Sequence, residues 1–217
     1  LSEEESKPAG PQGVVLYYPS KLPETRESEL YLALADVKDG SKGAPAIERL
    51  ENAIVKDAPA EPEFYFELGR AYAKAGRLDA AIRWYQEALR RRRAYPAVSK
   101  ELASALLAQG RMTQAGEILK QGLASNPSDD QLLADLGNLY LRQGQLANAR
   151  GALLRALDVD PSLAGAENLL GLAEVRAGDR TEAEKRFRAA IRDNPSLAEA
   201  HNNLGTLLTG TGQYEEA

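Results

Sequence analysis

A repeat of 34 residues is the feature of this chain that most restricts its fold. Five dipeptides, four of them Leu-Gly and one Leu-Ala, follow one another at intervals of 34 residues. They begin at Leu68, Leu102, Leu136, Leu170 and Leu204. A second glycine follows each dipeptide at a fixed distance, and an alanine recurs in the same register. Self-similarity at a period of about 20 to 50 residues indicates a repeat architecture, in which each unit buries its apolar face against the next.

Each unit predicts a helical hairpin. In the unit of residues 130–163, Leu133, Leu136 and Tyr140 recur at spacings of three and four, which is typical of one buried helix face. Gly144 follows where the first helix is expected to end, since glycine readily adopts the left-handed conformation of a helix C-terminal cap. Glycine inside a helix costs about 1 kcal/mol relative to alanine. The Leu-Gly glycines therefore predict a close approach between two antiparallel helices.

These residues resemble the tetratricopeptide repeat (TPR), a 34-residue motif that places Leu-Gly, aromatic, alanine and proline residues at these spacings. The resemblance implies an all-α fold, a TPR solenoid that forms a right-handed superhelix of antiparallel helical hairpins. It covers residues 62–217, as units 62–95, 96–129, 130–163 and 164–197 and a partial unit 198–217. Arg93 stands in a proline slot and Glu174 in an aromatic slot, and neither interrupts the register.

Two further segments are predicted upstream of the array. Residues 23–61 place Ala46, Leu50 and Ala53 in second-helix slots. They predict a degenerate, capping TPR-like hairpin, since terminal repeats are usually atypical. Residues 1–22 are rich in proline and glycine and predict an extended N-terminal segment or linker. Because the chain opens on leucine, we expect it to be a fragment or a processed protein.

Composition excludes several classes of function. The 217 residues include no cysteine and one histidine, His201, which removes thiolate chemistry and cysteine- or histidine-rich metal sites. There is no glycine-rich phosphate loop. We therefore expect no enzyme activity, no cofactor and no metal. No apolar run approaches the roughly 20 residues of a membrane span. His201 occupies a slot that holds Tyr65 and Leu133 in other units, so we interpret it as a packing residue.

The segment Arg90–Arg93 is the most basic part of the chain. Residues 62–95 carry 8 basic and 4 acidic side chains, between stretches with net charges of −5 and −4. The net charge of the whole chain is −5, whereas nucleic-acid-binding domains are usually basic. The pattern therefore predicts charge pairing within the molecule and no nucleic-acid partner.

The TPR resemblance also implies a function, because first helices of TPR proteins line a concave groove that binds peptides or proteins. The corresponding groove positions here are Phe66, Arg70, Lys74, Lys100, Ser104, Asn138, Arg142, Asn168, Arg176, Asn202 and Thr206. Lys74, Arg142 and Arg176 share one slot, which predicts a cationic stripe and an extended acidic peptide as the ligand. We expect a non-catalytic scaffold that binds proteins or peptides.

Two alternatives stay open. Residues 13–19, with the segment 29–33, resemble the junction that precedes TPR tails in some bacterial multihaem c-type cytochromes. The chain would then be the interaction tail of a larger exported bacterial enzyme or cytochrome, outside the cytoplasm; otherwise a cytoplasmic location is expected. Because residues 198–217 stop within the second helix of a unit, a self-assembling structural module, associating through this truncated hairpin, is the other alternative.

Overall fold

The computed structural model describes residues 26–40 and 42–210. Within these ranges the chain forms eleven helices and no strand, which confirms the all-α prediction. The helices are α1 (Arg26–Asp39), α2 (Gly43–Asp57), α3 (Pro62–Lys74), α4 (Leu78–Arg91), α5 (Pro96–Ala108), α6 (Met112–Ser125), α7 (Asp130–Arg142), α8 (Leu146–Val159), α9 (Ala164–Ala177), α10 (Arg180–Asp193) and α11 (Ala198–Thr209). The predicted N-terminal segment, residues 1–22, lies outside the described residues.

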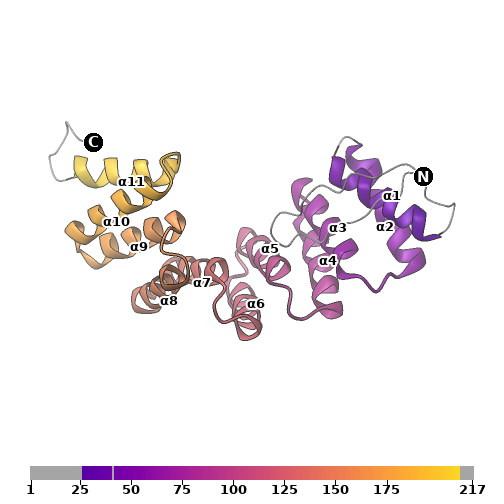
Figure 1. The fold of residues 1–217 in the computed structure, drawn as a ribbon, viewed down its shortest axis with the longest axis horizontal. Helices are drawn as coiled ribbons and strands as arrows, with labels where there is room; N and C mark the ends of the chain where they lie inside the picture. The colour runs from indigo at the N-terminus through magenta and orange to yellow at the C-terminus, as the bar shows by residue number, and fades with distance from the viewer. Residues whose placement is uncertain (1–25, 41, 211–217) are drawn as a thin grey trace, which may run out of the picture.

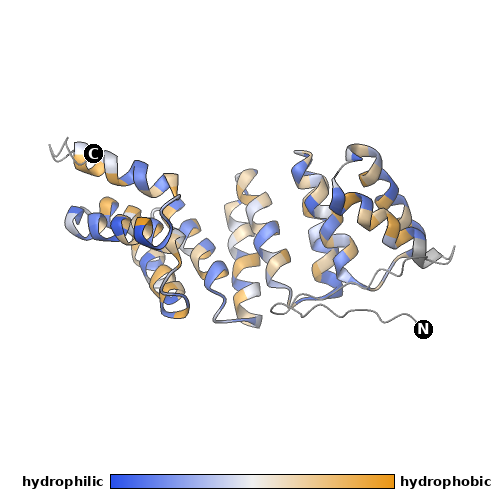
Figure 2. Cartoon of the chain, turned by 45° about the horizontal axis from the view of Figure 1, so that its top comes forward, coloured by the Kyte–Doolittle hydropathy of each residue, from blue (hydrophilic) through white to orange (hydrophobic). Residues whose placement is uncertain are grey.

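The helices pack as consecutive antiparallel hairpins, which confirms the predicted solenoid. α3 packs on α4, α5 on α6, α7 on α8 and α9 on α10. Figure 1 shows the hairpins following one another in chain order, so the described ends of the chain lie at opposite ends of a curved array. First helices of adjacent units also touch, α5 with α7 and α7 with α9. Every helix carries both apolar and polar residues (Figure 2), as expected when one face is buried.

The hairpin turns use the glycines that the repeat predicts. Gly76, Gly110, Gly144 and Gly178 all have a positive φ, between 72° and 89°. Residues with a Cβ pay a steric penalty in this region, so glycine is favoured there. The predicted glycine caps are therefore confirmed at the four turns inside the described array.

The close approach of the two helices in each unit is also confirmed. A Cβ atom added to Gly137 in α7 would lie 2.6 Å from Cγ of Leu153 in α8. At Gly171 in α9, it would lie 2.5 Å from Cε1 of Phe187 in α10. Leu153 and Phe187 are completely buried. Gly137 and Gly171 thus make room for the largest core side chain of the facing helix.

Glu174 departs from the repeat pattern at an aromatic slot and is nevertheless buried, with 4% of its surface exposed. Its Oε1 atom lies 3.3 Å from Nε of Arg150 in α8. Burying a carboxylate is unfavourable unless an opposite charge is close. The ion pair between α9 and α8 therefore offsets part of the cost of this burial, while Oε1 of Glu174 accepts no hydrogen bond from the described residues.

The side chain of His201 is exposed in the described part of the chain, and its Nε2 atom lies 2.9 Å from the carbonyl oxygen of Pro195. In the first unit the same slot holds Tyr65, whose ring packs on Trp84 of the second helix at a centroid distance of 6.0 Å. Residues 211–217, where the second helix of this unit is expected, lie outside the described ranges. A packing role for His201 therefore stays a prediction.

Candidate peptide-binding groove

A cavity of about 410 Å³ lies between the first helices α5 and α7. Four of the groove positions predicted from the sequence line it: Lys100, Ser104, Asn138 and Arg142. They come from two adjacent units and are separated by as many as 42 residues in the chain. The folded array thus brings these four side chains to one concave site, which we call the α5–α7 groove.

The polar side chains of this groove are largely free to meet a ligand. Lys100 is exposed, and its Nζ atom donates to Oε1 of Gln131 at 3.3 Å. Arg142 is exposed and forms no hydrogen bond or ion pair with any residue in the described ranges. Ser104 is exposed and Asn138 is half-buried. The groove therefore presents two cations and two neutral hydrogen-bonding groups.

Two carboxylates also line the groove, from Glu101 and Asp135. Burial raises the pKa of Asp135 above its ordinary value of 3.8, the nearby Lys100 opposes this rise, and the negative charges of Asp129 and Glu101 add to it. The groove prediction omitted Asp135 and Glu101. The sequence nevertheless carries a signal for them, because an acidic residue recurs at one slot of the repeat, at Glu67, Glu101 and Asp135, 34 residues apart. Two of these three carboxylates, Glu101 and Asp135, therefore lie in the groove beside Lys100 and Arg142.

The raised pKa of Asp135 predicts a pH-dependent difference in stability between this chain and the Asp135→Asn variant. Because the folded-state pKa lies above that of the unfolded chain, protonation of Asp135 favours folding, and this contribution is lost as the pH rises through the raised pKa. We expect the variant to melt at a higher temperature than the parent near pH 7. The difference should shrink as the pH falls through the raised pKa of Asp135, because the parent side chain is then increasingly protonated and neutral.

Thermal melts of the two proteins across this pH range check the expectation. Asp158→Asn, on the exposed surface of α8, serves as the control for the loss of one surface carboxylate. A stability difference between Asp135→Asn and the parent that does not change with pH would contradict a raised pKa for Asp135.

Two other predicted groove residues are engaged in contacts between units. The guanidinium of Arg176 donates to the carbonyl oxygen of Leu141, so it links α9 to α7. Asn168 is buried, and its Oδ1 atom accepts from Nδ2 of Asn203 in α11 at 2.9 Å. The structure therefore distinguishes two members of the cationic slot: Arg142 is exposed and has no partner among the described residues, whereas Arg176 is paired.

At the N-terminal end of the array, the predicted groove residue Phe66 belongs to a small aromatic cluster. Phe66 is half-buried, with its ring centroid 5.5 Å from that of Tyr95. The guanidinium of Arg70 lies 5.7 Å from the Phe66 ring and 3.3 Å from the carboxylate of Glu67. At the other end, Asn202 and Thr206 are exposed on α11. None of these residues lines the α5–α7 groove.

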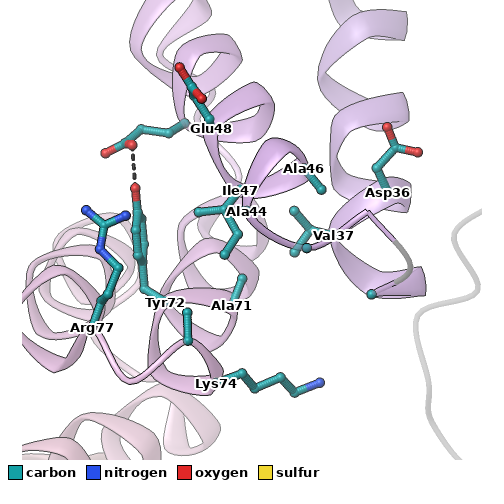
Figure 3. A pocket seen from close by; sticks show the side chains of 14 residues that line it. Asp36, Val37, Ala44, Ala46, Ile47, Glu48, Ala71, Tyr72, Lys74 and Arg77 are labelled. Atoms are coloured by element: carbon teal, nitrogen blue, oxygen red, sulfur yellow. Dashed lines mark hydrogen bonds between the residues drawn. The ribbon is translucent and has the colours of Figure 1, made fainter.

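Lys74, the remaining predicted position, lines a separate cavity of about 570 Å³ between the α1–α2 hairpin and the end of α3 (Figure 3). The Tyr72 hydroxyl in this cavity donates to Glu51, and the guanidinium of Arg77 lies 4.7 Å from the Tyr72 ring centroid. Lys74 and Arg142 therefore do not share a cavity. Because these polar groups already bond to one another, the α5–α7 groove is the better candidate for ligand binding.

The arginine-rich segment pairs with nearby carboxylates. Arg90 and Arg91 both form ion pairs with Glu87. Arg92 lies 3.9 Å from Glu63, across to α3. Three of the four arginines therefore pair with carboxylates of residues 62–95 themselves, and pairing with the acidic stretches on either side stays a prediction.

Comparisons with known sequences agree with the repeat architecture. Two family models, both described as tetratricopeptide repeat, match the chain. One matches residues 38–98 and 168–217, and the other matches residues 75–131 and 106–171. No curated protein is similar to the chain at a significant level. None of the described helices is long and apolar enough to span a bilayer.

Many solved structures share the fold. A tetratricopeptide repeat protein from Parabacteroides merdae is 22% identical, with a TM-score of 0.76 over 87% of this chain and 74% of its own. MamA from Desulfovibrio magneticus is also 22% identical, with a TM-score of 0.69 over 82% of this chain and 99% of its own. YrrB, a TPR protein with an unusual peptide-binding site, is 18% identical, with a TM-score of 0.66 over 82% and 91% of the two chains.

These comparisons give no support to the resemblance to cytochrome tails, which stays a hypothesis. The repeat spacing, the glycine-mediated hairpins and the solenoid agree with the family models, one of which alone matches about half of the residues. The chain belongs to the tetratricopeptide repeat family.

Proposed function

We propose that this chain is a non-catalytic scaffold that binds an extended segment of another protein in its α5–α7 groove. The observation that carries the proposal is the cavity of about 410 Å³ lined by Lys100, Ser104, Asn138 and Arg142. Ligand sites in proteins are typically clefts of about 300–1,000 Å³ with a few convergent polar groups. TPR repeats typically serve as protein-interaction modules, and the fold relative YrrB is named for a peptide-binding site.

The charges of the groove restrict the ligand. Arg142 and Lys100 attract carboxylates, whereas Asp135 and Glu101 repel them. The hydroxyl of Ser104 and the amide of Asn138 can each donate and accept hydrogen bonds, as a peptide backbone requires. We propose an extended peptide whose backbone lies across α5 and α7, and whose acidic side chain or free carboxylate pairs with Arg142.

Charge reversal at Arg142 tests this proposal. A fluorescein-labelled peptide of alternating glycine and glutamate serves as the probe, and its affinity is measured by fluorescence anisotropy. Arg142→Glu is expected to weaken binding about tenfold, which corresponds to about 1.4 kcal/mol. Binding to the parent protein should also weaken as salt is added, since exposed charges are screened beyond about 8 Å at physiological ionic strength.

Lys56→Glu is the matched control, because Lys56 is exposed on α2 and lines neither wall of the groove. It should bind the probe with nearly the parent affinity, and both variants should keep the parent helicity and melting temperature. Equal affinities of the Arg142 variant and the parent protein at low salt would show that the ligand lies elsewhere.

We also propose that residues 23–61 form the cap of the array, ahead of the units in residues 62–217. Three contacts support this role. The ring of Tyr31 packs edge-on against Phe64 of α3, with centroids 5.2 Å apart. Arg49 of α2 forms ion pairs with Glu29 and Asp36 of α1, which hold the hairpin together.

A further inference from the structure

A second cleft lies on the opposite side of α5 from the α5–α7 groove. Its volume is about 740 Å³, and its walls are the second helices α4 and α6. Buried Ser99 and Leu102 of α5 line its floor, beside half-buried Leu89 of α4 and Ile118 of α6. Successive helix residues are about 100° apart, so Leu102 and the groove residue Ser104 point in nearly opposite directions. We call this second site the α4–α6 cleft.

Two arginines give one wall of the α4–α6 cleft a positive charge. Arg90 has 72% of its side chain exposed and pairs with Glu87, one turn earlier in the same helix, at 2.6 Å. Arg93 is exposed and forms no hydrogen bond or ion pair with any of the described residues. Arg93 occupies the slot that holds Pro127, Pro161 and Pro195 in the following units. The departure from the repeat pattern therefore places at this cleft a cation that has no partner in the described part of the chain.

The cleft also carries groups suited to a peptide backbone. Gln86 of α4 and Gln121 of α6 are both exposed and line the cleft from opposite walls. A glutamine amide both donates and accepts hydrogen bonds. A main chain lying between the two helices could bond to both walls, with an apolar side chain directed at Leu89 and Ile118.

We propose that the α4–α6 cleft is a second docking surface, for a segment of a partner protein that carries an apolar side chain between carboxylates. The carboxylates pair with Arg90 and Arg93, and the apolar side chain covers the floor of the cleft. Single-stranded nucleic acid is a poorer match, since such sites use aromatic side chains to stack bases. No aromatic residue is among the described residues that line the cleft.

The proposal is tested with a capped, fluorescein-labelled peptide that has leucine and phenylalanine between two pairs of glutamates. Its binding is measured by fluorescence anisotropy at low ionic strength. Arg93→Glu is expected to weaken binding at least tenfold. Ala124→Trp, which leaves every charge in place but adds a large ring at the exposed cleft residue Ala124, is expected to weaken it by a similar factor.

Matched variants separate this cleft from the rest of the surface. Lys56→Glu controls for charge reversal, and Ala147→Trp, at an exposed alanine of α8, controls for the added ring; both should bind like the parent. The proposal is overturned if the parent does not bind the peptide at millimolar concentration, or if Arg142→Glu weakens binding and Arg93→Glu does not. It is also overturned if Arg93→Glu weakens the binding of an oligothymidine probe but not the binding of the peptide. Melting curves of all variants verify that the fold is kept.

Discussion

Replacing Phe187 with alanine is expected to lower the free energy of unfolding by about 3–5 kcal/mol, the range for removing a buried aromatic ring. Phe187 is completely buried in α10, where it contacts the backbone position left open by Gly171 in α9. It belongs to a cluster with Ala183 and with Leu207 of α11, so its loss leaves a cavity shared by three helices. Urea denaturation followed by circular dichroism measures the effect.

The control for this prediction lies in the same helix. Lys185 has 68% of its side chain exposed and pairs with Glu182 at 3.4 Å. Lys185→Ala should change the free energy of unfolding by no more than about 0.5 kcal/mol, as is usual for surface sites. In solenoids, the free energy of unfolding is approximately the sum of the stabilities of the single repeats and of the interfaces between adjacent repeats. Hydrogen exchange should therefore show the loss of protection from Phe187→Ala concentrated in α9 to α11. Similar denaturation midpoints for the two variants would contradict the packing role of Phe187.

The second large effect is expected from Gly137→Leu, which should destabilise the fold by about 1–3 kcal/mol or more, because overpacking forces side chains and backbone to shift. Even the first added atom, Cβ, would lie 2.6 Å from Leu153. The nearest backbone atom, the carbonyl oxygen of Ala149, is 3.4 Å away. Leu153 is fully buried, so it has little room to move without separating α7 from α8.

The same change from glycine to leucine at Gly151 should stabilise the fold instead. Gly151 lies in α8, the partner helix of α7, but it is exposed, and a Cβ atom there would meet nothing within 4 Å. Leucine is a better helix former than glycine by almost 1 kcal/mol, so Gly151→Leu should raise stability by about 0.5–1 kcal/mol. Gln143→Leu, at an exposed position after α7, should stay within about 0.5 kcal/mol. If the Gly137 and Gly151 variants unfold at the same urea concentration, helix propensity rather than close packing governs these glycines.

The sequence predicted the architecture because the information is local and repeated. Each unit carries its own helix faces, its own cap glycine and its own Leu-Gly pair, so each element is specified several times over. The two departures from the repeat pattern, Glu174 and Arg93, differ in burial and in pairing, and the sequence did not predict this difference. Glu174 is buried and forms an ion pair with Arg150, whereas Arg93 is exposed and has no partner among the described residues.

The sequence by itself determined which residues form helices and where the hairpins turn, whereas the slots that line a groove stayed a prediction. Only the tertiary structure decided which of the groove side chains are free. Lys74, Arg142 and Arg176 occupy one slot of the repeat, yet Lys74 lines another cavity and Arg176 bonds to Leu141. The reason is physical: helix formation depends on neighbours a few residues away, whereas the pairing of a long cationic side chain depends on atoms supplied by a different unit. The residues concerned, 35 apart for Arg176, meet only once the units have stacked.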